Sequence, residues 1–345
     1  MMRKLAVALL VVGGCDKPSS PAGQEAASVD AAPQVPTLRI GYDPTVLSAF
    51  GPLPAKLDHP ANPPTDDKIA LGRRLYFDKR VSLGKDISCN DCHDVGKNGD
   101  DGKVTSTGTK GAVNTRNTPT IFNAAGAHAQ GWDARASTIE AMITKHVQEP
   151  SIMGLDEKGL VLALASEQAA FKAAFPDEKT PVSAETFGKA VGAYARKLVT
   201  PSKWDKFIAS RDPDLLTEAE RFGLGAFIDA GCNTCHLGKY MGASQNQKLG
   251  IARPWPPPAG TDSGREGVTK QPLDRGVFKV PTLRNVTRTG PWMHDGSVAS
   301  LDEIVRLMAH HQVGKNIPEV QVKSIITFLH TMDGEPLPTA LTSRP

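Results

Sequence analysis

The 345-residue sequence has no long hydrophobic run and no strong excess of one charge. Its N-terminal apolar run, residues 5–12, is eight residues long, which is too short to span a bilayer, and no other segment approaches the required length. The net charge of +3 is too small for a typical nucleic-acid binder, and no basic run is interleaved with aromatic residues. We therefore expect neither a spanning helix nor a nucleic-acid partner.

The N-terminus is typical of an export signal. Arg3 and Lys4 precede the apolar run, and two glycines separate that run from Cys15. Small residues directly before a cysteine resemble a bacterial lipoprotein signal, which predicts a lipid on Cys15; a plain secretory signal with an incidental cysteine is the alternative. We assign residues 1–15 to the signal and 16–50, rich in Ala, Pro, Ser and Gln at its start, to a flexible linker. The expected location is the periplasm, with membrane contact only through the lipid anchor.

The cysteines are arranged for ligation rather than for disulfide bonds. Four of the five lie in two Cys-x-x-Cys-His motifs. In such motifs both thiols attach to a haem and the histidine becomes the proximal ligand of its iron. A zinc site is disfavoured because contiguous Cys and His strain a tetrahedral geometry, and a thioredoxin-like pair needs strands that the sequence scarcely signals. The predicted haem-attachment residues are Cys89, Cys92, Cys232 and Cys235, and the predicted proximal ligands are His93 and His236.

The two halves of the chain repeat one another. Pro119-Thr120 matches Pro281-Thr282 at an offset of 162, and the same offset pairs Asp133 with Asp295. Internal repetition of this kind indicates a duplicated structural unit. We therefore expect a mainly α-helical chain with long loops, built from two tandem cytochrome-c-like haem domains at 51–200 and 201–345.

Helical periodicity is strongest in a few segments, two of which begin at the capping candidates Thr138 and Ser300. Thr217 is followed by Glu220 at capping-box spacing. The long stretch 238–279 is expected to be a loop. The other predicted helices cover 66–78, 160–175, 184–199, 218–230 and 319–332.

The repeat also suggests the second axial ligands. Met308 lies on the inward apolar stripe of the helix after Ser300, and a thioether ligand stabilises reduced haem iron. Subtracting 162 gives His146, on the matching stripe of the earlier helix. His146 is either a ligand of the first haem, a side chain poised above it, or an ordinary core histidine. Other candidates for the second haem are weaker: Met241, Met293, His294, His310 and His311.

These features together resemble the bacterial di-haem cytochrome c peroxidase family, which includes the di-haem enzyme of methylamine dehydrogenase maturation. The resemblance covers about 68–334 and rests on both haem motifs and on 116–120, 131–136 and 280–296. It implies that the first haem is the peroxidatic site and that the second, with Met308 as ligand, stores electrons. It also implies electron transfer through Trp132. A calcium ion is implied at Asn117, Thr289 and Pro291, whose oxygens suit this ion.

The sequence departs from the family pattern around the first haem. The family's switchable histidine ligand corresponds to Thr109, its catalytic glutamine to Met142 and its catalytic glutamate to Ile152, none of which can do the same chemistry. Ala134 replaces a signature glycine. His146 stands where the family has a distal-pocket proline, so we list it with Trp132 as a catalytic candidate, and Glu149 is a nearby alternative base.

Three functions follow. The first is reduction of hydrogen peroxide with electrons from a small periplasmic donor, a cytochrome c or a cupredoxin. The second is a non-enzymatic electron carrier or redox sensor, in which His93 and His146 close the first haem. The third is a maturation-type oxidase that acts on a protein partner. The resemblance also implies homodimers, which are common in the family.

Overall fold

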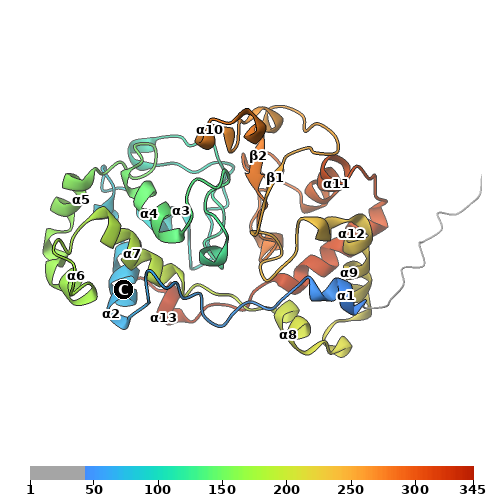
Figure 1. Ribbon diagram of the computed structural model, residues 1–345, viewed down its shortest axis with the longest axis horizontal. Coiled ribbons are helices and arrows are strands. Elements are labelled where there is room, and N and C mark those ends of the chain that lie inside the picture. The colour runs from blue at the N-terminus through green and yellow to red at the C-terminus, as the bar shows by residue number, and fades with distance from the viewer. Residues whose placement is uncertain (1–42) are drawn as a thin grey trace, which may run out of the picture. The chain divides into compact units, whose positions relative to one another are not determined.

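The computed structural model describes residues 43–345, so Cys15 and the predicted signal lie outside the described residues. The regular structure there is mostly helical (Figure 1), which confirms the prediction of a mainly α-helical chain. No helix in 43–345 is long and apolar enough to cross a membrane. Short strands β1 (Asn246–Lys248) and β2 (Val277–Lys279) pair antiparallel. The helices are α1 (Pro44–Ser48), α2 (Asp66–Tyr76), α3 (Cys89–Cys92), α4 (Ile139–Gln148), α5 (Glu157–Ala163), α6 (Gln168–Ala174), α7 (Ala184–Ala195), α8 (Lys203–Ser210), α9 (Glu218–Ala230), α10 (Glu266–Thr269), α11 (Leu301–Gln312), α12 (Glu319–Leu329) and α13 (Thr339–Thr342).

Helices α2, α4 and α7 form the centre of the N-terminal half (Figure 1). Almost all residues of α7 are buried. Its many alanines and glycines let neighbouring helices approach closely, and Phe187 and Tyr194 fill the space in the core between them. The crossing with α2 is close: a Cβ on Gly72 would lie 1.9 Å from the carbonyl oxygen of Ala190. Only glycine fits there, so this residue sets how near the two helices approach.

The C-terminal half repeats this arrangement with α9, α11 and α12. Gly223 of α9 allows the same close approach between α9 and α12, since a Cβ there would lie 2.1 Å from the carbonyl oxygen of Ser324. The predicted capping box is present, with Thr217 and Glu220 bonding each other's backbone N–H. Phe227 and Phe328 meet in the core with ring centroids 5.3 Å apart.

The offset of 162 found in the sequence recurs in the backbone. Isolated bridges join residues 130 and 136 in one half and 292 and 298 in the other. Asn123 and Asn285 both have φ of 62° and donate through Nδ2 to the hydroxyl of Thr200, at 2.9 and 3.0 Å. Equivalent turns of the two halves thus meet on one residue.

Some predicted boundaries differ from the structure. The segment 160–175 is broken, with α5 and α6 separated by a short 3₁₀ turn, because Leu164 and Glu167 leave helical geometry. The stretch 238–279 is mostly loop but contains β1, β2 and α10. Ser300 caps α11 through Glu303 N–H, while the return bond of a capping box is not formed.

The two ends of the described part of the chain, 43–345, pack on opposite halves. Leu47 and Phe50 are buried in the C-terminal core, so the last residues of the predicted linker, 16–50, are part of the folded C-terminal half. Conversely, Leu341 packs on the N-terminal core, and its carbonyl accepts a hydrogen bond from Tyr194 at 2.6 Å. Each half is therefore closed by a segment from the far end of the chain, which sequence repetition alone does not reveal.

Candidate functional site

The first Cys-x-x-Cys-His motif begins with the short helix α3. Asp91 holds its start by accepting hydrogen bonds from the backbone N–H and the hydroxyl of Ser88, at 2.8 and 2.6 Å. The second motif follows Gly231, whose φ of 90° ends α9 and turns the chain back. None of the four motif cysteines forms a disulfide, so all four sulfurs are available for covalent attachment to a haem.

Both motif histidines are oriented in the same way. Nδ1 of His93 lies 3.0 Å from the carbonyl oxygen of Pro119, and Nδ1 of His236 lies 3.1 Å from that of Met241. A carbonyl only accepts, so each Nδ1 carries the proton and each Nε2 is left with a free lone pair. Burial lowers the pKa of His93, and it lowers the pKa of His236 to about 4, which keeps both rings neutral. This is the protonation state and the orientation that a metal-ligating imidazole needs.

Each motif lines a cavity of its own. The first cavity, about 590 Å³, is lined by Cys89, Cys92 and His93 and by the inward face of α4. The second cavity, about 230 Å³, is lined by Cys232, Cys235 and His236 and by the inward face of α11. In both, thiols and a neutral imidazole lie among apolar side chains. That donor set fits a covalently attached haem, whose ring is apolar and whose iron takes a nitrogen ligand.

His146 lines the first cavity from α4, where the duplication predicted it. Its ring has no hydrogen-bond partner among the described residues. Burial, together with His93 and Arg135, lowers the pKa of His146 to about 3, so the imidazole is neutral. A neutral, unpaired imidazole in this cavity can bind a metal or accept a proton.

The other departures from the family pattern fall in different places. Met142, Ile152 and Glu149 line the first cavity. Thr109 is absent from that lining: its hydroxyl donates to Asp86 at 2.8 Å and accepts from the N–H of Gly84 at 2.8 Å. Thr109 is therefore part of a turn and not of the cavity surface.

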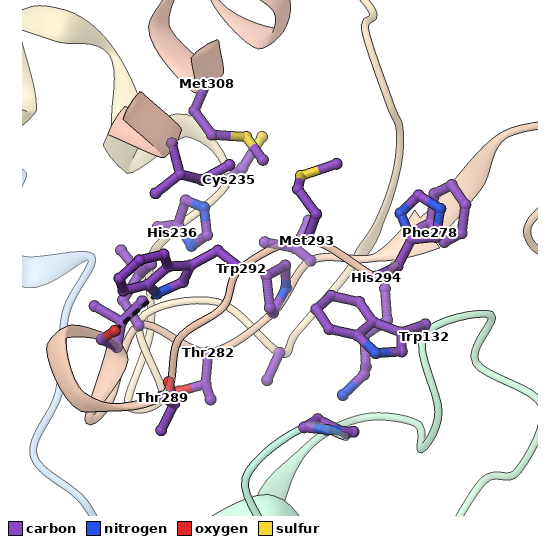
Figure 2. A pocket seen from close by; sticks show the side chains of 18 of the residues that line it. Trp132, Cys235, His236, Phe278, Thr282, Thr289, Trp292, Met293, His294 and Met308 are labelled. Atoms are coloured by element: carbon purple, nitrogen blue, oxygen red, sulfur yellow. Dashed lines mark hydrogen bonds between the residues drawn. The ribbon is translucent and has the colours of Figure 1, made fainter. Parts of the chain in front are cut away.

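Two thioethers enter the second cavity. Figure 2 shows Met308 descending from α11 towards Cys235 and His236, and Met293 pointing into the same space from the turn before α11. Met293 has φ of 79° at the position where Gly131 stands in the first half. Met241 is fully buried in the C-terminal core, outside the lining. His310 and His311 are partly exposed and are held beside Arg253 and Trp255.

Trp132 lies where the two cavities meet, since it lines both. Its indole N–H donates to the carbonyl of Asn117 at 2.9 Å, and its ring meets that of His294 edge-on with centroids 6.4 Å apart (Figure 2). His294 in turn stacks on Phe278 at 4.2 Å. Trp132 and His294 are themselves related by the offset of 162, so the repeat brings its own equivalent positions into contact.

The predicted calcium ligands are close in the fold. Asn117, Thr289 and Pro291 all line the second cavity. The amide nitrogen of Asn117 donates to the carbonyl of Lys103 at 2.7 Å, which leaves its side-chain oxygen for another partner.

An ion-pair cluster centred on Arg116 was not predicted from the sequence. Arg116 bonds both Asp133, at 2.7 Å, and Asp262, at 3.1 Å, and Asp262 lies 3.5 Å from Nε2 of His294. Asp262 comes from the long loop, 129 residues beyond Asp133, and no periodicity connects them. The only available signal was that such a long loop is usually functional.

Comparisons with known proteins agree with this geometry. The family described as di-haem cytochrome c peroxidase matches residues 66–213. Cytochrome c551 peroxidase of Pseudomonas aeruginosa is 35% identical over 315 residues, which cover 86% of this chain and 90% of that protein. Methylamine utilization protein MauG of Methylorubrum extorquens is 28% identical over 361 residues, covering 99% of this chain and 97% of that one.

A solved structure is also similar. The crystal structure of a MauG-like protein associated with microbial copper homeostasis superposes with a TM-score of 0.73 and 26% identity, covering 85% of this chain and 97% of that chain. Similarity of sequence and fold extends over most of both chains in these comparisons. The chain therefore belongs to the di-haem cytochrome c peroxidase family.

Proposed function

We propose that this chain reduces hydrogen peroxide at the first cavity with electrons received at the second. The observation that carries the proposal is the pair of cavities, each with a complete attachment set, joined at Trp132. The relatives named cytochrome c551 peroxidase support it, since they are 35% identical over most of this chain. Two haem c groups are the cofactors that family membership implies.

The chain's own residues would divide the work as follows. His93 and His236 would hold the two irons through Nε2, and the backbone carbonyls on Nδ1 keep both rings in place. When bound, the haems supply redox-active iron, one storing an electron and the other reacting with peroxide. Met308 is the proposed sixth ligand of the second, where a thioether favours the reduced state.

His146 is the proposed acid–base residue. Reduction of hydrogen peroxide consumes two electrons and two protons and yields two waters, so a proton must move from one oxygen to the other as the O–O bond breaks. The Nε2 or Nδ1 lone pair of His146 can accept that proton and return it. Ile152 and Met142 line the same cavity and cannot, which leaves His146 and Glu149 as the titratable candidates from the segment 142–152 with a vacant lone pair.

Trp132 is the proposed electron path, because it lines both cavities and its N–H bond to Asn117 fixes the ring. The proposed donor is a small periplasmic cytochrome c or cupredoxin. A calcium ion on Asn117, Thr289 and Pro291 would rigidify the segment beneath Trp132. We further propose two tandem haem domains, at 51–200 and 201–345, in a periplasmic protein anchored through Cys15; homodimers remain an expectation from the family.

One observation favours a second function. His146 occupies the position equivalent to Met308, so it can also close the first haem as a permanent sixth ligand. The protein would then carry or sense electrons without reacting with peroxide. A maturation-type oxidase is a third function, in keeping with the 28% identity to MauG over nearly the whole chain.

The test is peroxide-dependent oxidation of a reduced small cytochrome c or cupredoxin by the purified two-haem protein. Turnover that requires peroxide supports the proposal. Two haems that remain low-spin in the fully oxidised and half-reduced protein, with no response to peroxide, would favour the carrier and exclude the peroxidase.

A further inference from the structure

The second cavity has an unusual charge distribution. Its lining contains one lysine, Lys279, no arginine, and no aspartate or glutamate. Lys279 is the last residue of β2, and its backbone N–H donates to the carbonyl of Trp132 at 2.8 Å. The strand therefore fixes this lysine at the side of the cavity that faces the N-terminal half.

The ammonium group of Lys279 makes no ion pair and no side-chain hydrogen bond with any described residue. Burial lowers the pKa of Lys279 to about 8, and no neighbouring charge offsets this effect. Lys279 is partly exposed at the cavity wall, and a ligand that fills the cavity would desolvate its ammonium group, which is unfavourable without a partner. A partner that the polypeptide does not supply is therefore expected in the cavity.

The first cavity is different in this respect. Its two arginines already have carboxylate partners: Arg116 bonds Asp133 and Asp262, and Arg135 bonds Asp133 at 2.6 Å. Both arginines of the first cavity are therefore paired with carboxylates of the chain, whereas Lys279 of the second cavity has no carboxylate partner among residues 43–345.

We propose that Lys279 is the cationic anchor for a propionate of the haem in the second cavity. Haem carries two propionate carboxylates, which are the negative groups that the lining lacks. A lysine is suited to this contact because its ammonium is a compact charge on a flexible stem. The inference rests on the proposed function only in requiring a haem at Cys232 and Cys235.

The pairing has a consequence for electron storage. A positive charge beside a haem favours the ferrous over the ferric state, so Lys279 raises the potential of the second haem. It would do so together with Met308 and from the side of the cavity that carries Trp132.

The experiment compares Lys279→Met, Lys279→Arg and Lys248→Met with the wild-type two-haem protein. Lys248 is an exposed lysine of the neighbouring strand β1 and serves as the matched control. Two properties of the second haem are measured: its midpoint potential by spectroelectrochemical titration, and the frequency of its propionate bending mode by resonance Raman spectroscopy. If Lys279→Met does not accumulate, Lys279→Gln replaces it.

We expect Lys279→Met to lower the midpoint potential and shift the propionate mode, Lys279→Arg to keep both near wild type, and Lys248→Met to change neither. An unchanged potential and mode in Lys279→Met or Lys279→Gln overturns the assignment. A lowered potential with an unchanged propionate mode also overturns it, because the ammonium would then act from elsewhere. Peroxide turnover is assayed separately, so loss of the proposed function is distinguishable from loss of the anchor.

Discussion

The two cavities contain the same attachment chemistry but differ on the side contributed by α4 and α11. Both present two thiols and a histidine whose Nδ1 is tied to a backbone carbonyl. Opposite this common set, the second cavity offers the thioether of Met308, whereas the first offers the imidazole of His146. A thioether stabilises reduced iron, while an imidazole can either ligate or transfer a proton. In the proposed function, this difference at one pair of equivalent positions contributes to the separation of an electron store from a reactive site.

The largest effect is expected from removing the haem-attachment cysteines of one cavity while leaving those of the other intact. We expect Cys89→Ala with Cys92→Ala to leave one covalent haem per chain and to abolish peroxide turnover, because only the electron-storing cavity remains. Pyridine haemochrome absorbance gives the haem content. Cys15→Ser is the control and should keep both haems, since Cys15 has no motif partner. Two haems in the double variant would contradict the assignment of the first motif.

The next largest effect is expected at His146. If it transfers the proton, His146→Ala should lower the turnover rate by about 10²- to 10⁴-fold without changing the spin state of the first haem. If it ligates, the variant should instead lose a low-spin signal in EPR. Lys145→Ala, an exposed neighbour on α4, is the control. Unchanged rate and unchanged spectrum together would remove His146 from the site.

A buried ion pair between Arg196 and Glu140 is expected to stabilise the N-terminal half far more than an exposed pair does. Arg196 donates to both carboxylate oxygens of buried Glu140, at 2.8 and 2.9 Å. Removing one partner of a buried pair leaves an uncompensated charge, so Arg196→Met should reduce the free energy of unfolding by about 3–5 kcal/mol. Arg74→Met is the control, because its exposed pair with Glu167 should contribute no more than about 1 kcal/mol. Urea unfolding measures both, and equal losses would refute the distinction.

The same pair predicts a pH dependence. Burial alone would raise the pKa of Glu140, but hydrogen bonds from Arg196 and Asn62 outweigh it, and the net effect lowers the pKa. A lowered folded-state pKa stabilises the protein above the ordinary glutamate value, and this stabilisation is lost as the pH falls through the folded value. Wild-type stability should therefore fall more steeply than that of Arg196→Met below about pH 4.5.

The smallest expected effect comes from Ala134. Its φ of 55° lies in the left-handed region, and the equivalent residue of the second half is Gly296, with φ of 66°. Glycine adopts this conformation without steric cost, so Ala134→Gly should raise stability by roughly 0.5–1 kcal/mol. Ala141→Gly, within α4, should lower stability by about 1 kcal/mol instead. Thermal unfolding midpoints that move in the same direction would contradict this reading.

Local signals in the sequence account for much of this picture. The two motifs and the caps at Thr138, Thr217 and Ser300 are short-range patterns, and the structure forms all three caps. The offset of 162 is a long-range repeat, but it can be found by comparing the sequence with itself. Features that depend on distant residues were not predictable. Asp262 reaches Arg116 from a loop without periodicity, and Leu47 and Leu341 cross to opposite halves. That no residue in 43–345 pairs with the ammonium group of Lys279 is visible only once the cavity lining is known.

In the proposed function, electrons held at the second cavity reduce peroxide at the first. The most direct measurement starts from half-reduced wild-type protein, in which one electron resides on the second haem, and adds hydrogen peroxide while absorption and EPR are recorded. We expect rapid oxidation of the second haem together with a spectral change at the first. Two low-spin haems whose spectra do not change on addition of peroxide would contradict it.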